Sequence, residues 1–229
     1  MDTPGILNPW FPFPHRILDD FLSPALCAAV ASDWPAPDWS GWVAYDPRFD
    51  RTHASDLATP LPRSAGIALY HMARESLGAL VGQPASVPDL SLWGGGLHEI
   101  LPGTGGLGCH LDASVSPRLG LRRAWSAILW VHPRWEESWG GQLILHDADR
   151  KPVKVIEPRP GRLAVFATHS ASWHSVRPVT GSAPRRSLAL FGYAESRPGH
   201  AERPRALFLP AEGEDDSPEA VRARRDRSA

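Results

Sequence analysis

Two short motifs in the second half of the chain carry residue types that bind metal ions. His110 and Asp112 stand two positions apart, and His174 follows later in a separate apolar segment. On an extended chain, residues two apart project from the same face. An imidazole and a carboxylate on one face can bind one metal ion, and His174 would supply a third ligand. Two histidines and one carboxylate form the facial set of non-haem Fe(II) sites, so the sequence predicts such a site.

The other histidines fit this pattern less well. His53, His71 and His146 have no carboxylate two positions away, and His200 with Glu202 lies in a charged C-terminal segment with no third ligand after it. His169 remains an alternative third ligand, although it stands in a polar turn before the strand that His174 opens. A His-x-Asp pair on its own is more often a simple polar pair at a strand end, so the surrounding motifs decide its meaning.

A second polar pair has the chemistry to hold a carboxylate. Arg185 and Ser187 are two apart at the start of an apolar, strand-like segment, so they share one face. A guanidinium fork beside a hydroxyl suits a co-substrate that carries a carboxylate. Arg186 points to the opposite face and remains the alternative. Trp130 shares a strand face with Ser126 and Ile128, the face expected to point inward.

Composition limits the class of protein. The 229 residues carry a net charge of -1 and 42% hydrophobic residues, as expected of a globular chain without a strong field for nucleic acid or membrane. Two cysteines, Cys27 and Cys109, make no disulfide framework. Because no apolar run approaches the roughly 18 residues that span a bilayer, and no signal-like segment opens the chain, we expect a cytoplasmic protein.

The hydrophobic pattern predicts one domain over residues 1–196. Turn residues and short apolar runs from about residue 90 to 194 favour a core of about eight strands. We expect residues 197–229 to form a charged, disordered tail, pinned at most by the apolar patch at 207–209. Before the core, the pattern predicts a strand over His15–Phe21, a helix from Ser23 to about Trp34, an irregular segment over Asp38–Pro60 and an amphipathic helix over Pro62–Val81.

From about Phe13 to Tyr193 the chain resembles the Fe(II)/2-oxoglutarate dioxygenases, and within them the prolyl 4-hydroxylase-like group. The resemblance depends on several motifs that occur in the order typical of that family. They are Pro14–Leu22 with the following helix, Gly94–His98, Pro102–Asp112, Arg122–Val131, Gly140–Leu143, Pro160–Phe166, Trp173–Val179 and Arg185–Tyr193.

The resemblance implies a fold that is mainly β with flanking helices. Its core would be a double-stranded β-helix, of the jelly-roll or cupin-like kind, with the N-terminal helices packed on one sheet. His110, Asp112 and His174 would bind Fe(II), and Arg185, Ser187 and Trp130 would bind 2-oxoglutarate. Trp130 falls where relatives often carry a tyrosine, and a role in the core is equally compatible with it. O2 would be the other co-substrate, with ascorbate as a further cofactor.

The implied reaction is hydroxylation of an unactivated C–H bond, with succinate and CO2 as co-products. Related halogenases carry a small residue at the position of Asp112, so its carboxylate favours hydroxylation. The implied substrate is a prolyl residue of a peptide or protein, or a proline-like free amino acid. Alternatives are an oxygenase acting on nucleic acid or on a small metabolite, and a catalytically silent β-helix that only binds. The near-zero charge and the apolar strand after Arg185 argue against nucleic acid.

Two segments are expected over the mouth of the site. They are Asp38–Asp56 and Ala113–Leu121, the second being either a mobile lid or a plain surface loop. Arg122 and Arg123 would either bind an acidic group of the substrate or simply open a strand. A tyrosine that the family carries before its glycine-rich turn has no counterpart, since Leu101 precedes Pro102 here. Cys109 alternates with His110, so we expect a buried thiol on the opposite face.

Overall fold

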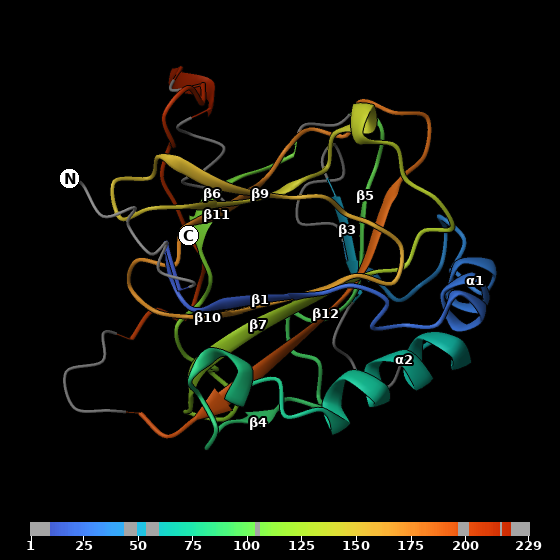
Figure 1. Cartoon of the computed structure of the whole chain (residues 1–229), viewed down its shortest axis with the longest axis horizontal. Coiled ribbons are helices and arrows are strands. Elements are labelled where there is room, and N and C mark those ends of the chain that lie inside the picture. Colours follow the sequence, from blue (N-terminus) through green and yellow to red (C-terminus); the bar gives the residue numbers. More distant parts are fainter. Residues whose placement is uncertain are drawn as a thin grey trace, which may run out of the picture.

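Two antiparallel sheets face each other at the centre of the molecule (Figure 1). The computed structural model describes residues 10–43, 50–53, 60–103, 106–196, 202–215 and 217–220. The larger sheet has the order β1-β10-β7-β12-β5-β3-β2, with β4 beside β12, and the smaller has the order β13-β6-β11-β8-β9. The eight strands from β5 to β12 are divided between the two sheets, which confirms the predicted double-stranded β-helix.

The strands are short, as the spacing of turn residues predicted. The larger sheet contains β1 (His15–Leu18), β2 (Trp42–Val43), β3 (Asp50–His53), β4 (Val87–Pro88), β5 (Gly96–Ile100), β7 (Arg122–Trp130), β10 (Leu163–Ala167) and β12 (Arg185–Ala194). The smaller sheet contains β6 (Leu107–Leu111), β8 (Leu143–His146), β9 (Pro152–Ile156), β11 (His174–Val176) and β13 (Leu207–Phe208).

Side chains alternate along the strands of the larger sheet, so apolar clusters form on both of its faces. On β12, Leu188 and Leu190 join the cluster between the sheet and the helices, while Ala189 and Phe191 face the other way. On β7, Leu129 belongs to the helix side and Trp130 to the cluster between the two sheets. The face between the sheets is therefore the one on which the predicted site residues lie.

Two helices cover the outer face of the larger sheet (Figure 1). Helix α1 (Pro24–Ser32) begins as predicted, because the Ser23 hydroxyl accepts a hydrogen bond from the Leu26 N–H at 3.3 Å and Pro24 occupies the first turn. Helix α2 (Arg63–Arg74) is shorter than the predicted Pro62–Val81. If the helix continued, its buried face would next place Glu75 or Ser76, both polar, against the core. The chain instead becomes extended at Glu75, and Leu77 is buried.

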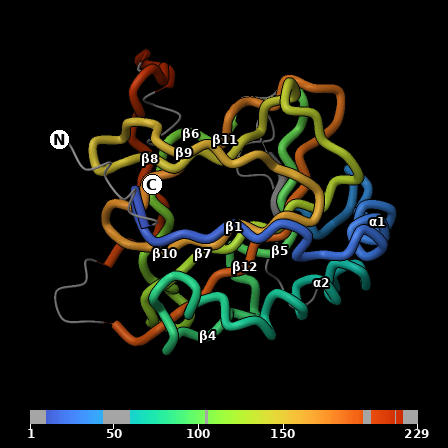
Figure 2. The backbone as a smooth tube through the Cα atoms, in the orientation of Figure 1, coloured from blue at the N-terminus to red at the C-terminus, as the bar shows by residue number. Residues whose placement is uncertain are grey.

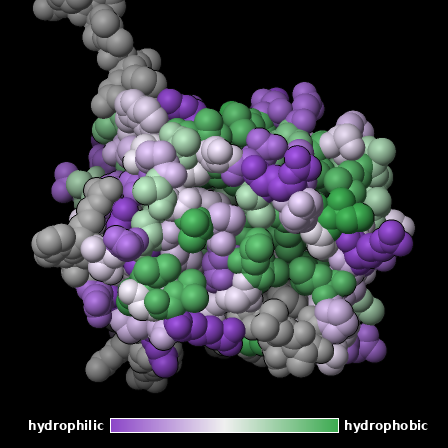
Figure 3. Space-filling view, turned by 90° about the horizontal axis from the view of Figure 1, so that it is seen from below, coloured by the Kyte–Doolittle hydropathy of each residue, from purple (hydrophilic) through white to green (hydrophobic). Residues whose placement is uncertain are grey.

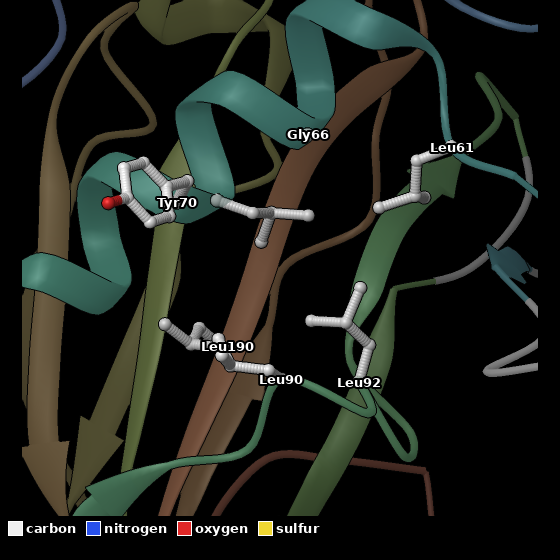
Figure 4. Close-up of a pocket in the computed structure, with 7 residues that line it drawn as sticks. Leu61, Gly66, Tyr70, Leu90, Leu92 and Leu190 are labelled. Carbon is white, nitrogen blue, oxygen red and sulfur yellow. The ribbon is translucent and has the colours of Figure 1, made fainter. Parts of the chain in front are cut away.

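A shallow apolar pocket of about 150 Å³ lies between α2 and the outer face of the larger sheet (Figure 4). Figure 3 views the molecule from the side of α2 and β4 and shows apolar residues gathered in patches there. Since Leu190 points to this outer side of the sheet, the pocket is separate from the predicted site. It is lined by Leu61, Gly66, Leu69, Tyr70, Leu90, Leu92 and Leu190.

The segment expected to be irregular contributes two strands. Strand β3 extends the larger sheet beyond β5, and β2 pairs with β3 at the edge. The remainder of Asp38–Asp56, expected over the mouth, includes residues 44–49 and 54–56, which lie outside the described residues. Among the described residues, no helix combines the length and apolar character that crossing a bilayer requires.

The C-terminal segment corrects one expectation. Residues 202–215 are not a disordered tail, because β13 pairs with β6 and the Arg203 N–H donates to the Ser114 hydroxyl at 2.8 Å. Figure 2 shows this segment beside the smaller sheet, at the end away from α1 and α2. The predicted apolar patch at 207–209 does supply the strand. Residues 197–201 and 221–229 lie outside the described residues.

Candidate active site

The smaller sheet brings the three predicted metal-binding side chains together. His110 lies on β6, Asp112 directly follows that strand, and His174 opens β11, where it is the cross-strand partner of His110. Their ligand atoms lie within 4.8 Å of one another. The Nε2 atoms of His110 and His174 are each 3.7 Å from Asp112 Oδ1. This geometry fits three ligands of one metal ion, the set that leaves further coordination positions in facial non-haem iron sites.

Backbone carbonyls orient both imidazoles. The Nδ1 atom of His110 lies 2.9 Å from the Gly108 carbonyl oxygen, and that of His174 lies 3.0 Å from the Ser172 carbonyl oxygen. Because a carbonyl only accepts, each Nδ1 carries the proton and each Nε2 lone pair is left for a metal. Burial, and then the neighbouring His110, lower the pKa of His174 to about 4, so this ring is neutral at pH 7.

Two side chains of the larger sheet hold the outer oxygen of Asp112. The Ser126 hydroxyl donates to Asp112 Oδ2 at 2.6 Å, and Arg123 Nη1 lies 3.5 Å from the same oxygen. Oδ1 is thereby left facing the histidines. Burial by itself would raise the pKa of Asp112, but His174, a hydrogen bond with His110 and the charge of Arg123 hold it well below its ordinary value. The carboxylate is ready to bind a cation without losing a proton.

Arg123 is a site residue whose role the sequence analysis left open. Strict alternation would place it opposite Ser126, but β7 carries one extra residue at Ala124, where its register with β12 shifts. Such a bulge reverses the alternation. Arg123 therefore faces inward, donates to the Tyr193 hydroxyl at 3.1 Å and places its guanidinium 3.7 Å from the Phe191 ring centre. Arg122 points away and contacts the Glu195 carbonyl oxygen and Gln83.

Arg185 and its neighbours form a second polar cluster on the inner face. Arg185 is 3% exposed, and its Nη1 donates to the Ser187 hydroxyl at 3.3 Å. Its guanidinium carbon is 5.5 Å from the Trp130 ring centre. Burial lowers the pKa of Arg185 to about 9, so the group is still charged at pH 7. Arg185 Nη2 and Trp130 Nε1 are buried without a protein partner, which is the condition of donors that await an acceptor.

A two-glycine turn fixes the Arg185 side chain. The Gly141 carbonyl oxygen accepts from Arg185 Nε at 2.8 Å. Gly141 has φ +70, and a Cβ there would lie 3.1 Å from Arg185 Cδ and 3.0 Å from Trp135 Cζ2. At Gly140, with φ +73, a Cβ would collide with the Pro178 carbonyl oxygen. Both positions therefore require glycine, which gives the Gly140–Leu143 motif a physical cause.

The alternative residues lie elsewhere. Arg186 points to the opposite face, where its Nε donates to Glu99 at 2.9 Å. The His169 ring accepts from the Ala171 N–H at 3.1 Å and contacts Phe13, outside the cluster of ligand atoms. Cys109 is fully buried on the far side of β6, packed with Leu111 and Trp173.

The segment after Asp112, expected to be a mobile lid or a surface loop, is partly buried. Residues 113–116 are buried, and the Ser116 N–H donates to the Leu121 carbonyl oxygen at 2.9 Å. The Gly120 N–H donates to the Ser116 carbonyl oxygen at the same distance. Only the tip at 117–120 is exposed. This segment is therefore a hydrogen-bonded turn between β6 and β7.

A double-stranded β-helix with two histidines and an aspartate on its inner face defines a class of non-haem iron oxygenase. Residues 95–193 match the family model described as the 2OG-Fe(II) oxygenase superfamily. Over this stretch the protein therefore resembles the 2-oxoglutarate-dependent dioxygenases of that superfamily, and its fold resembles that of the prolyl hydroxylases. Fe(II), 2-oxoglutarate and O2 are the cofactor and co-substrates that a match to this superfamily implies. The ligand atoms of His110, Asp112 and His174 fit a metal ion such as Fe(II). The unpartnered donors Arg185 Nη2 and Trp130 Nε1 fit an anionic co-substrate such as 2-oxoglutarate.

Solved structures share the fold at low sequence identity. A prolyl-4-hydroxylase from Pseudomonas putida is 23% identical, with a TM-score of 0.53 over 80% of this chain and 94% of its own. A prolyl hydroxylase from Trichoplax adhaerens, in complex with a hypoxia inducible factor peptide fragment, is 19% identical, with a TM-score of 0.55 over 79% and 83%. A viral collagen prolyl hydroxylase from Paramecium Bursaria Chlorella virus-1, in its 2OG complex, is 15% identical, with a TM-score of 0.52 over 80% and 97%. No curated protein matches the sequence.

Proposed function

We propose that the protein hydroxylates a prolyl residue of a peptide or protein, or a proline-like amino acid. In this proposal His110, Asp112 and His174 hold Fe(II), while Arg185, Ser187 and Trp130 hold 2-oxoglutarate. The observation that carries the proposal is the pair of buried, unpartnered donors, Arg185 Nη2 and Trp130 Nε1, on the same inner face as the three ligand atoms. Leaving two such donors without an acceptor costs several kcal/mol in order of magnitude, which an anionic co-substrate would offset.

Bound together, Fe(II), 2-oxoglutarate and O2 supply the oxidising power for C–H hydroxylation, with succinate and CO2 as co-products. The protein residues bind and orient. Both imidazoles are fixed with Nε2 toward the metal position, and Ser126 and Arg123 turn Asp112 so that Oδ1 faces it. Arg185, itself fixed by the Gly141 carbonyl, offers its free N–H to the distal carboxylate of 2-oxoglutarate.

A prolyl substrate is supported by the surroundings of Asp112. Phe191 and Tyr193 form an aromatic wall beside Arg123, which contacts Asp112 directly. An apolar ring such as that of proline packs well against aromatic side chains, and a buried arginine can bind the carbonyl of a peptide. Prolyl hydroxylases share this fold, and one of them is known with a peptide bound.

The test uses the visible metal-to-ligand charge-transfer band of Fe(II) with 2-oxoglutarate, recorded without O2. The wild-type protein should show the band and His110→Ala should not. Arg185→Ala should need about 100-fold more 2-oxoglutarate to develop it, because a lost charge-assisted hydrogen bond costs about 1.5–3 kcal/mol. Arg186→Gln is the matched control, because Arg186 points to the opposite face, and it should titrate like the wild type.

Substrate class follows from succinate release in air, with and without ascorbate. Proline-containing peptides and free proline are compared with peptides in which alanine replaces proline. Release that depends on proline, with one oxygen atom added to the substrate, supports the proposal. A folded, iron-loaded wild type without the band would contradict the co-substrate assignment. A band with no proline-dependent turnover would contradict only the substrate.

A further inference from the structure

We infer that the C-terminal segment 202–215 is part of the metal centre, with Phe208 positioning His110 and Arg203 positioning Asp112. This inference depends on the metal site proposed above. It adds that the affinity of the site for metal depends on side chains that lie beyond the matched oxygenase domain, which covers residues 95–193.

The backbone of this segment completes the strand that carries the first ligand. Strand β13 pairs with β6, with Leu207 opposite Leu111 and Phe208 opposite His110. The Leu209 N–H also donates to the Cys109 carbonyl oxygen at 3.1 Å. Without these bonds, β6 would be the open edge of the smaller sheet, and edge strands are the least constrained part of a sheet.

The Phe208 ring lies directly against the His110 ring. Their centroids are 4.8 Å apart and their planes meet at 20°, which is a stacked arrangement. The His110 ring also contacts His174, with centroids 4.1 Å apart. Its Nδ1 is bonded to the Gly108 carbonyl oxygen. Stacking on Phe208 thus adds a third constraint on the plane of the imidazole, and that plane decides where the Nε2 lone pair points.

Two charged side chains of the segment hold the backbone on both sides of His110. Arg203 Nη2 donates to the Asp112 carbonyl oxygen at 2.5 Å, and the Ser114 N–H donates to the Arg203 carbonyl oxygen at 2.7 Å. The Glu214 carboxylate accepts from the Cys109 N–H at 2.9 Å. Arg203, Phe208 and Glu214 therefore converge on residues 109–114, the stretch that contains two of the three ligands.

The decisive experiment measures Fe(II) affinity, without O2, by calorimetry on the full chain. Phe208→Ala should weaken Fe(II) binding about tenfold, the size of effect that outer-shell partners of metal ligands have. It should also shift or broaden the charge-transfer band with 2-oxoglutarate. Phe208→Tyr keeps a stacking ring and should restore both. Leu209→Ala is the matched control, since Leu209 is in the same segment with an exposed side chain, and it should bind like the wild type.

Arg203→Met gives an independent second variant, since it removes the donor to the Asp112 carbonyl while keeping an apolar stem. It too should lower Fe(II) affinity, with the metal-free protein still folded by circular dichroism. Wild-type affinity in folded Phe208→Ala and Arg203→Met overturns the inference, as does an equal loss in Leu209→Ala. If Phe208→Ala does not fold, Arg203→Met decides. A wild type that binds no Fe(II) refutes the proposed function instead.

Discussion

Several single residues in the interior of this protein have buried polar atoms with no hydrogen-bond partner in the protein. Trp130 Nε1, Arg185 Nη2 and both ring nitrogens of His132 belong to this group. His132 follows β7, two residues after Trp130, and its ring stacks on Trp135 with centroids 4.4 Å apart. Burial, and then the charges of Arg185 and Arg186, lower the pKa of His132 to about 3. This imidazole is therefore neutral in the folded protein at pH 7.

We predict that His132 makes the metal-free protein lose stability on acidification. The folded-state pKa lies below the unfolded value of 6.5, so the contribution of His132 is complete above pH 6.5 and is lost as the pH falls toward 3. Each pH unit in this window costs about 1.4 kcal/mol. From pH 7.5 to 5, His132→Phe should therefore lose about 2 kcal/mol less than the wild type in the free energy of unfolding by urea.

The comparison between the two proteins isolates His132, because every other titratable group is the same in both. Phenylalanine fits the same stacked position, and no ring nitrogen loses a partner in the exchange. Parallel stability curves for wild type and His132→Phe would mean that His132 is protonated in the folded state.

The bulge in β7 decides which side chains of the larger sheet reach the site. By adding Ala124 to the strand, it turns Arg123 toward Asp112 while Trp125 stays on the helix side. The partner strand must accommodate Trp125 at this point, and Gly192 on β12 leaves that space. A Cβ on Gly192 would collide with Trp125 Cε2.

We predict that Gly192→Ala destabilises the protein by about 1–3 kcal/mol, the usual cost of overpacking a core. The free energy of unfolding by urea measures the change. Gly66→Ala is the matched control, since a Cβ at Gly66 in α2 meets nothing within 4 Å. That change should stabilise the protein by up to about 1 kcal/mol, because alanine favours a helix over glycine. Equal effects of the two substitutions would show that the contact with Trp125 is relaxed in solution.

Local patterns in the sequence predicted the elements that depend on local chemistry. The Ser23-Pro24 start of α1, the alternation in β12 and the grouping of His110 with Asp112 follow from nearest neighbours along the chain. The inward turn of Arg123 was not predictable in this way, because it depends on a register shift between β7 and β12. The pairing of Phe208 with His110 joins distant parts of the chain, and no local pattern encodes it.

At the scale of the whole molecule, the candidate metal site links the two sheets. His110 and His174 belong to the smaller sheet, whereas Asp112 is held by Ser126 and Arg123 of the larger one. An ion bound to all three therefore stabilises the packing of one sheet on the other. The predicted β-helix could be read from the ordered motifs, but this mechanical role depends on contacts between sheets that only the structure shows.

We predict that removing the metal lowers thermal stability. At a free Fe(II) concentration of 100 times Kd, binding adds about 2.7 kcal/mol to the free energy of unfolding. For a chain of this size that corresponds to roughly 5–10 °C in Tm, measured without O2 with and without a chelator. Asp112→Ala lacks one ligand and should show little shift. A full shift in that variant would place the ion elsewhere.

The position of β13 in the chain also has a consequence during synthesis. Translation runs from the N-terminus, so His110 and His174 emerge before Phe208, which follows His174 by 34 residues (208 − 174). At about 5–20 residues per second, this interval lasts roughly 2–7 s. During those seconds the nascent chain has both imidazoles but neither the edge pairing of β6 nor the ring that covers His110. On the inference above, a growing chain acquires its tight grip on iron only once Phe208 has left the ribosome.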